Sequence, residues 1–135
     1  MKKLVLLSLF LISISLLKAQ ADEKNTTEIL KVVKLYLTVT DNLDSTAILK
    51  AFHPDAKLMS VTKSGELKKM TLYDWWSRIS RIPNPKVRKS KIDILDISGI
   101  SAVVRVEFEK STDLLSLLKI NNEWKIINKT LSIVL

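Results

Sequence analysis

The stretch TDLLSLLKINNEWKIINKTLSIVL (Thr112–Leu135) decides the fold, because it has the pattern of a β-hairpin. The mostly apolar run Leu114–Ile120 predicts a strand that is largely covered on both faces. Asn121–Asn122 predicts a two-residue turn, since asparagine tolerates the positive φ that tight hairpins require. The return strand, Trp124–Leu135, is rich in Ile, Thr and Val. A period of two places four of its residues on one face: Trp124, Ile126, Asn128 and Thr130.

Upstream of the hairpin, the patterns alternate between helices and strands. The cap pattern Asn25–Glu28 predicts an amphipathic helix to about Thr40, and a shorter helix runs from about Ser45 until Pro54 stops it. A third helix begins at the cap pattern Thr71–Asp74 and ends at Pro83. Strands are predicted at 56–62, 66–70, 86–97 and 101–110. Three helices beside a mainly antiparallel sheet make an α+β fold, and 135 residues suit a single domain.

The N-terminus has the pattern of a secretory signal. Lys2 and Lys3 precede an apolar run over residues 4–17 that is short for a membrane span. Ala19 and Ala21 follow, so we expect a signal peptide at residues 1–21, cleaved after Ala19 or Ala21, and one domain at 22–135. The alternative is an uncleaved anchor. We expect a bacterial protein, exported to the periplasm or secreted, with no stable membrane anchor after cleavage.

Composition excludes several kinds of chemistry. The chain has no cysteine, which rules out disulfides, thiolate metal sites and cysteine nucleophiles. Without residues 1–21 the domain keeps 19 basic and 14 acidic residues, a mild positive bias. The basic run 86–91 contains no aromatic residue of the kind that stacks on nucleic acid bases, so we expect a solvated strand edge and no nucleic acid partner.

Three segments carry a family resemblance: FHPDA at 52–56, DLLSLLKI at 113–120 and EWKIINK at 123–129. With this order of elements, the chain resembles NTF2-like cone proteins, and within them the putative lumazine-binding, SnoaL-like group. It departs from that group at Asn121–Asn122, where a turn with glycine is usual, and at Thr112 and Leu114, where aromatic residues are usual. The resemblance implies a curved sheet wrapped on the helices around a conical pocket, often in a homodimer built through the sheet. The superfamily includes isomerases, dehydratases, cyclases and binding modules, so the fold alone does not decide the function.

Candidate catalytic residues are few. His53 is the single histidine, and Asp55 follows it by two positions, so the pair could act in acid–base chemistry. The alternative is local: His53 caps the helix end and Asp55 ties down the next turn. A site of the ketosteroid isomerase type needs an Asp base, a Tyr and a protonated acid, yet only Tyr36 and Tyr73 are available, and no second acid is predicted on a pocket-facing strand position. One histidine and scattered carboxylates predict no metal site.

Candidate binding residues are aromatic or amide side chains. Trp75 and Trp76 point about 100° apart on a helix, so we expect one in the core and one near the pocket mouth or a dimer surface. Asn128 shares the inward face of Trp124 and Ile126, so it needs a polar partner in the protein or a ligand. The predicted pocket lining is Tyr36, Phe52, Trp75 or Trp76, and Asn128.

These features predict an exported, non-catalytic protein that binds a small aromatic or apolar molecule in a conical pocket, without a cofactor. The alternatives are a SnoaL-like isomerase, cyclase or hydratase that uses His53 and Asp55, and a structural dimerisation module. The expected partners are an unidentified small molecule and a second copy of the chain. Asp113 and Lys129 are expected to form a cross-strand ion pair near the open end of the hairpin.

Overall fold

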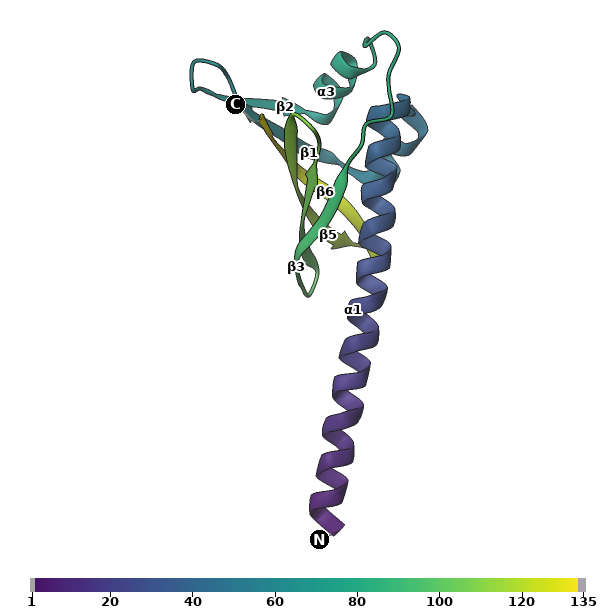
Figure 1. Ribbon diagram of the computed structural model, residues 1–135. Helices are drawn as coiled ribbons and strands as arrows, with labels where there is room; N and C mark the ends of the chain where they lie inside the picture. The colour runs from purple at the N-terminus through teal and green to yellow at the C-terminus, as the bar shows by residue number, and fades with distance from the viewer. Residues whose placement is uncertain (1, 134–135) are drawn as a thin grey trace.

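A computed structural model describes residues 2–133, which form helices on one side of a curved six-stranded sheet (Figure 1). The helical segments are α1 (Lys2–Asn42), the 3₁₀ turn η1 (Ser45–Ala47), α2 (Ile48–Ala51) and α3 (Leu72–Ile79). The strands are β1 (Phe52–Val61), β2 (Leu67–Thr71), β3 (Lys91–Ser98), β4 (Ser101–Glu107), β5 (Ser111–Ile120) and β6 (Glu123–Ile133). The predicted end of the hairpin at residues 134–135 lies outside the described part of the chain.

The sheet has the strand order β2-β1-β6-β5-β4-β3 over the described residues. Neighbouring strands are antiparallel except β1 and β6, which are parallel. Figure 1 shows α1 along one side of the sheet and α3 across its upper end. The predicted α+β class with a mainly antiparallel sheet is therefore confirmed.

The turn between β5 and β6 is the predicted two-residue hairpin turn. Ile120 pairs with Glu123, so only Asn121 and Asn122 lie between the strands. Their φ angles are 48° and 67°, and positive values at both central residues match the twist of the flanking strands. The turn thus brings β5 and β6 together at the centre of the sheet.

A bulge in β6 changes which side chains point inward. Ser116 pairs with Asn128, but the next residue, Leu117, pairs with Ile126, so Ile127 is an extra residue in β6. Leu115 is fully buried and pairs with Lys129, so Lys129 lies on the inner face. The prediction that Asn128 and Thr130 share the inward face of Trp124 and Ile126 was wrong, because the bulge reverses the alternation after Ile126.

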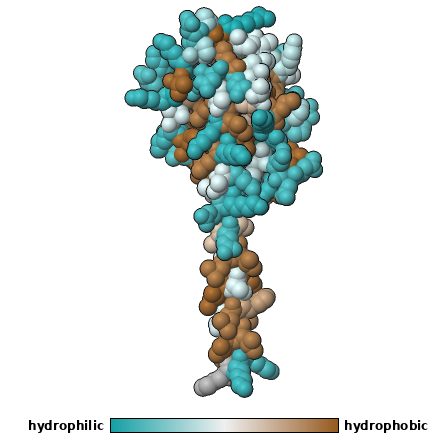
Figure 2. Space-filling model, turned by 90° about the vertical axis from the view of Figure 1, so that its right-hand side faces the viewer, coloured by the Kyte–Doolittle hydropathy of each residue, from teal (hydrophilic) through white to brown (hydrophobic). Residues whose placement is uncertain are grey.

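Helix α1 is longer than its sequence pattern suggested. It begins at Lys2 and continues through Asn25 without a break, so Asn25 is not a helix cap. The Asn25 Oδ1 atom instead accepts hydrogen bonds from Lys119 Nζ at 3.1 Å and Trp124 Nε1 at 3.3 Å. Residues 2–24 are exposed, and the first buried residue of the helix is Ile29. Figure 2 shows this exposed part as a mostly apolar stalk below the folded body.

The core lies between α1, α3 and the inner face of the sheet. Phe52 packs edge-on against Tyr36, with ring centroids 5.8 Å apart, and also contacts Trp75, at 5.4 Å. The predicted core position of Trp124 is confirmed, since it is 2% exposed. Val104, Leu115, Leu117 and Ile126 complete the centre of the inner face.

The segment between α3 and β3 has no regular secondary structure from residue 82 to residue 90. The strand predicted at 86–97 therefore begins only at Lys91, and the basic run is not a strand edge. Arg88 explains the difference, because its backbone N–H and side chain bond to Asp41 at the end of α1. The chain is held on the helix here and joins the sheet three residues later.

Candidate functional site

A cavity of about 620 Å³ opens at one end of the sheet. Its walls come from the second half of α1, from α3 and the segment after it, and from the ends of β5 and β6. The apolar lining comprises Trp75, Ile79, Ile82, Pro85, Leu131 and Ile133. The polar and charged lining comprises Tyr36, Thr40, Asn84, Lys86, Arg88, Lys110, Ser111, Asp113 and Lys129.

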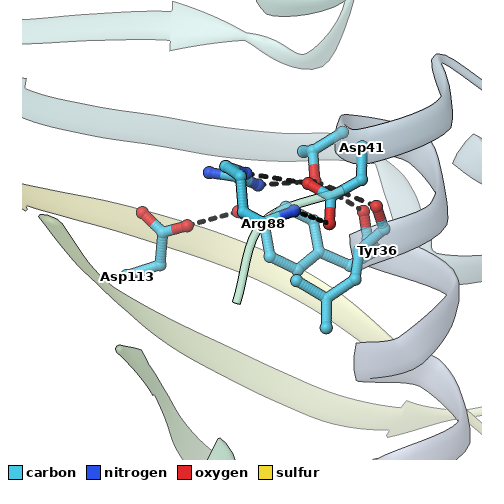
Figure 3. A network of polar contacts seen from close by, with 6 residues as sticks. Tyr36, Asp41, Arg88 and Asp113 are labelled. Carbon is cyan, nitrogen blue, oxygen red and sulfur yellow. Dashed lines mark hydrogen bonds and ion pairs between the residues drawn. The ribbon is translucent and has the colours of Figure 1, made fainter. Parts of the chain in front are cut away.

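Three polar residues from different elements meet in the buried part of the cavity. The Tyr36 hydroxyl donates a hydrogen bond to Asp113 Oδ2, and Figure 3 shows the Asp113 carboxylate pointing at Tyr36. Lys129 Nζ lies 3.0 Å from the other carboxylate oxygen, Oδ1, without a well-aligned hydrogen bond. Tyr36, Asp113 and Lys129 are 1%, 2% and 7% exposed, respectively. We call these three residues the polar cluster.

The local structure of each element explains how the polar cluster forms. Asp113, Leu115 and Leu117 are all buried and lie two positions apart along β5. Because side chains two positions apart point to the same face of a strand, Asp113 points inward. Lys129 points inward because of the bulge at Ile127. Tyr36 lies on the stripe of α1 that also buries Val32, Val33 and Val39.

Electrostatics gives the members of the polar cluster different roles. Asp113 and Lys129 each supply the opposite charge that the other requires in a buried position. Burial raises the pKa of Tyr36 well above its ordinary value, and the negative charge of Asp113 raises it further. The Tyr36 hydroxyl therefore keeps its proton at neutral pH and acts as a hydrogen-bond donor.

Arg88 fastens the segment after α3 beside the polar cluster (Figure 3). Its Nε lies 2.8 Å from Asp41 Oδ1, and its terminal nitrogen donates to Thr40 Oγ1 at 2.8 Å. The guanidinium also lies over the Phe108 ring, 3.9 Å from its centroid. Partial burial lowers the pKa of Arg88, but the bond to Asp41 more than offsets this, so its pKa remains above the ordinary value. Arg88 therefore stays charged and holds this cavity wall in place.

The structure separates the residues predicted to line the pocket. Tyr36 and Trp75 do line the cavity. Phe52 is fully buried behind them, in contact with both rings. Trp76 is half-buried and is not part of the lining, and Asn128 lies on the other face of the sheet. Thus Tyr36 and Trp75 come together at the cavity, whereas Trp76 and Asn128 do not.

His53 and Asp55 lie on β1, away from the cavity lining. The backbone N–H of Asp55 donates to His53 Nδ1 at 3.2 Å, and the Asp55 side chain is 90% exposed. The contact is local, as the non-catalytic alternative expected, although His53 lies in the strand and does not cap the helix.

Asp113 and Lys129 line the cavity although the sequence pattern did not assign them to it. Their ion pair is confirmed. The statement that no second acid occupies a pocket-facing strand position was wrong, because Asp113 does. An aspartate in phase with Leu115 and Leu117 was the available signal. Within residues 2–133, no group of three or more His, Asp or Glu side chains gathers to hold a metal ion.

Comparison with known proteins places this chain in a family. The family described as "Putative lumazine-binding" matches residues 24–132, which is most of the chain. The chain belongs to this family. The match includes every residue of the polar cluster.

Relatives of this putative lumazine-binding domain include an enzyme and proteins of unknown function. Aldolase FrzH of Cladobotryum sp. is 24% identical over 100 residues, covering 70% of this chain and 79% of that protein. An NTF2-like protein of unknown function from Methylobacillus flagellatus KT is 30% identical, with a TM-score of 0.68, covering 83% of this chain and 94% of that one. Another, from Shewanella baltica OS155, is 22% identical with a TM-score of 0.72, covering 83% and 95%. These similarities confirm the NTF2-like fold.

Proposed function

We propose that this protein binds a small, largely aromatic or apolar molecule in the cavity, with a polar group of that molecule reaching the polar cluster. The NTF2-like fold and the family fit a small-molecule-binding role. The volume of about 620 Å³ lies within the range of roughly 300–1,000 Å³ that is usual for ligand sites. Trp75, Leu131 and their apolar neighbours offer contact area for a ring system.

The observation that carries this proposal is the buried ion pair of Asp113 and Lys129 in a cavity wall. A fold rarely needs such a pair for stability, because well-packed apolar residues of similar size are often as stabilising. A buried charged pair beside an open volume, by contrast, offers oriented donors and acceptors to a guest. The pair is therefore better explained by ligand recognition than by packing.

A second hollow of similar size, about 640 Å³, lies between α1, α2 and the β5–β6 turn. Its charged lining comprises the exposed Lys31, Lys50 and Glu123 and the partly buried Glu28 and Lys125. No buried ion pair faces it among the described residues. The cavity with the polar cluster is the stronger candidate for this reason.

Fluorescence titration with 2-naphthol tests the proposal on protein isolated from its own host. Leu131→Trp should fill the cavity and abolish binding, because Leu131 forms part of its apolar wall. Asn128→Ala, a change in the same strand but on the other face, should leave binding unchanged. Circular dichroism should show that both variants fold. Equal binding by Leu131→Trp and the wild type would contradict the proposal.

Proton transfer on a bound carbonyl compound is a second candidate function. The polar cluster places a carboxylate, an ammonium and a phenol in one cavity, and a relative of this chain is named an aldolase. Asp113 would remove a proton from the carbon next to a carbonyl, and Tyr36 or Lys129 would donate a hydrogen bond to the enolate oxygen. We do not assign this role to His53 and Asp55, because they lie outside the cavity.

Deuterium exchange of 2-tetralone in heavy water, followed by NMR, tests this candidate. Catalysed exchange should be lost in Asp113→Asn and kept in Asn128→Ala. The absence of catalysed exchange with the wild type would leave binding alone as the proposed function.

We also propose that the protein is exported and that residues 1–21 are a signal peptide. The run 4–17 alone is short for a membrane span, but α1 extends it, and the N-terminal part of this helix is by length and composition sufficient to cross a membrane, a property that signal sequences share. Cleavage after Ala19 or Ala21 would remove no buried side chain, since residues 2–24 are exposed. N-terminal sequencing should find Gln20 or Asp22 first in periplasmic or secreted protein. An intact N-terminus in the membrane fraction would favour the anchor.

We also propose that the protein forms a homodimer through the outer face of its sheet. The outer face of β5 carries Leu114, which is 40% exposed, together with Ser116 and Leu118. Leu114→Glu should convert a dimer to a monomer in light scattering, because a carboxylate in the centre of such an interface would lose its hydration. A monomeric wild type would contradict the dimer and also the purely structural alternative.

A further inference from the structure

The charges around the cavity are unevenly distributed. Four cationic side chains line it, namely Lys86, Arg88, Lys110 and Lys129, against one carboxylate, Asp113. The mild positive bias of the whole domain does not by itself explain this ratio. The positive excess continues into an adjoining hollow between the basic segment and the β4–β5 turn, which has five cationic side chains against two carboxylates.

Two of the four cations are already neutralised within the protein. Lys129 is paired with Asp113 at 3.0 Å, and Arg88 is paired with Asp41 at 2.8 Å. Lys86 and Lys110 have no carboxylate within 4 Å among residues 2–133. The net positive charge of the cavity therefore comes from these two lysines.

Lys86 and Lys110 reach the cavity from two separate segments. Lys86 belongs to the segment that Arg88 holds against α1, and Lys110 belongs to the turn between β4 and β5. Both side chains are exposed, so they lie at the rim and not in the buried part. An anionic group held between them would place the rest of the molecule against the apolar wall.

Nearby acidic residues do not cancel this charge inside the cavity. Glu107 is paired with Arg105 at 3.1 Å. Glu107 and Glu109 do not line the cavity but an adjoining hollow, which shares Lys86, Arg88 and Lys110 with it and in which cationic side chains outnumber these two carboxylates. The concave rim thus focuses a positive potential on any molecule that enters.

We propose that the molecule bound in the cavity is an organic anion: an aromatic or apolar body with one carboxylate or similar group that Lys86 and Lys110 hold at the rim. This inference rests on the proposed binding function and adds the charge class of the ligand. The buried polar cluster then receives a neutral hydrogen-bonding group at the other end of the molecule, because its own charges are already paired.

The test compares two probes with the same ring system, 2-naphthoate and the neutral 2-naphthamide, by fluorescence titration of protein isolated from its own host. The naphthoate should bind about tenfold more tightly, and its advantage should shrink as salt is added, because the rim is open to solvent. In the double variant Lys86→Gln/Lys110→Gln, naphthoate should bind only as tightly as naphthamide, and naphthamide binding should not change.

The matched control is Lys63→Gln/Lys69→Gln, which removes the same charge from exposed positions that do not line the cavity. It should retain the preference for naphthoate. Equal affinity of the wild type for both probes would overturn this inference while the proposed binding function stands. Failure of both probes to bind would contradict the proposed function, and this inference with it.

Discussion

The Tyr36 hydroxyl on α1 donates a hydrogen bond to the Asp113 carboxylate on β5, across 77 positions of sequence. Lys129 of β6 completes the contact from the other side of the carboxylate. The polar cluster therefore links the long helix to both strands of the C-terminal hairpin. Any change in one of these residues should be detected in the stability of the fold as well as in binding.

The stability of the protein should fall as the pH rises above about 10, because Tyr36 is protonated in the folded state. Burial and Asp113 hold the pKa of Tyr36 well above its ordinary value of 10.0, so the unfolded chain loses this proton at a lower pH than the folded one. The stabilising contribution is complete below the unfolded pKa and is lost as the pH rises through the folded pKa. Urea unfolding of the wild type and Tyr36→Phe across this range should show a steeper fall for the wild type.

All other residues are the same in the two proteins, so the difference between the two curves reports Tyr36. Identical pH dependence in the two proteins would show that the folded-state pKa of Tyr36 is not raised.

Removing one partner of the buried ion pair between Asp113 and Lys129 should lower the stability of the fold. Lys129→Met leaves the Asp113 carboxylate buried without its cation, which should cost about 3–5 kcal/mol in the free energy of unfolding. The double variant Asp113→Leu/Lys129→Met should recover much of this loss, with about 1–3 kcal/mol remaining because the Tyr36 hydroxyl has no acceptor.

Chemical denaturation measures these differences. Asn128→Ala, one position from Lys129 but on the outer face, should change stability by less than about 0.5 kcal/mol. A double variant that is less stable than Lys129→Met alone would mean that the pair contributes net stability, against the interpretation that it serves recognition.

Arg88→Ala should release the segment between α3 and β3. The change leaves Asp41, which is 6% exposed, with a weaker set of partners, so we expect a loss of about 1–3 kcal/mol. Trypsin should then cleave after Lys86 or Lys89 several times faster than in the wild type, as mass spectrometry of the fragments will show.

Arg88→Lys should protect the segment from trypsin less well than the wild-type arginine does, because an ammonium cannot reproduce the two-nitrogen contact with Asp41 and Thr40. Arg81→Ala removes an exposed arginine between α3 and this segment and should not change cleavage at the lysines. Unaltered cleavage in Arg88→Ala would mean that the segment is held by other contacts.

Glycine in the hairpin turn should maintain the stability of the fold, whereas a β-branched residue there should lower it. Asn122 has a φ of 67°, a conformation that costs a residue with a Cβ roughly 1–2 kcal/mol. Thermal unfolding should show a higher or unchanged midpoint for Asn122→Gly and a lower one for Asn122→Val. Asn128→Val makes the same chemical change within a strand, where valine is favoured, and should not destabilise the fold. Equal effects of the two valine substitutions would argue against the positive-φ explanation.

Much of the fold could be predicted because the decisive signals are local. The Asn121–Asn122 turn, the third helix and the hairpin each depend on residues a few positions apart. Thr71 behaves as its cap pattern predicts, since its Oγ1 accepts a hydrogen bond from the backbone N–H of Asp74 at 3.1 Å. The same local reasoning was wrong at Asn25, where the side chain bonds to Trp124 and Lys119, residues remote in the sequence.

The sequence by itself determined the α+β class, the order of the elements and the central hairpin of this protein, because backbone preferences and hydrophobic periodicity act over short distances. Only the tertiary structure decided the site. The bulge at Ile127 depends on how β6 pairs with β5, and it turns Lys129 inward and Asn128 outward. Tyr36, Asp113 and Lys129 then meet because helix and sheet pack together, and burial gives their charges and hydrogen bonds a strength that no pattern along the chain encodes.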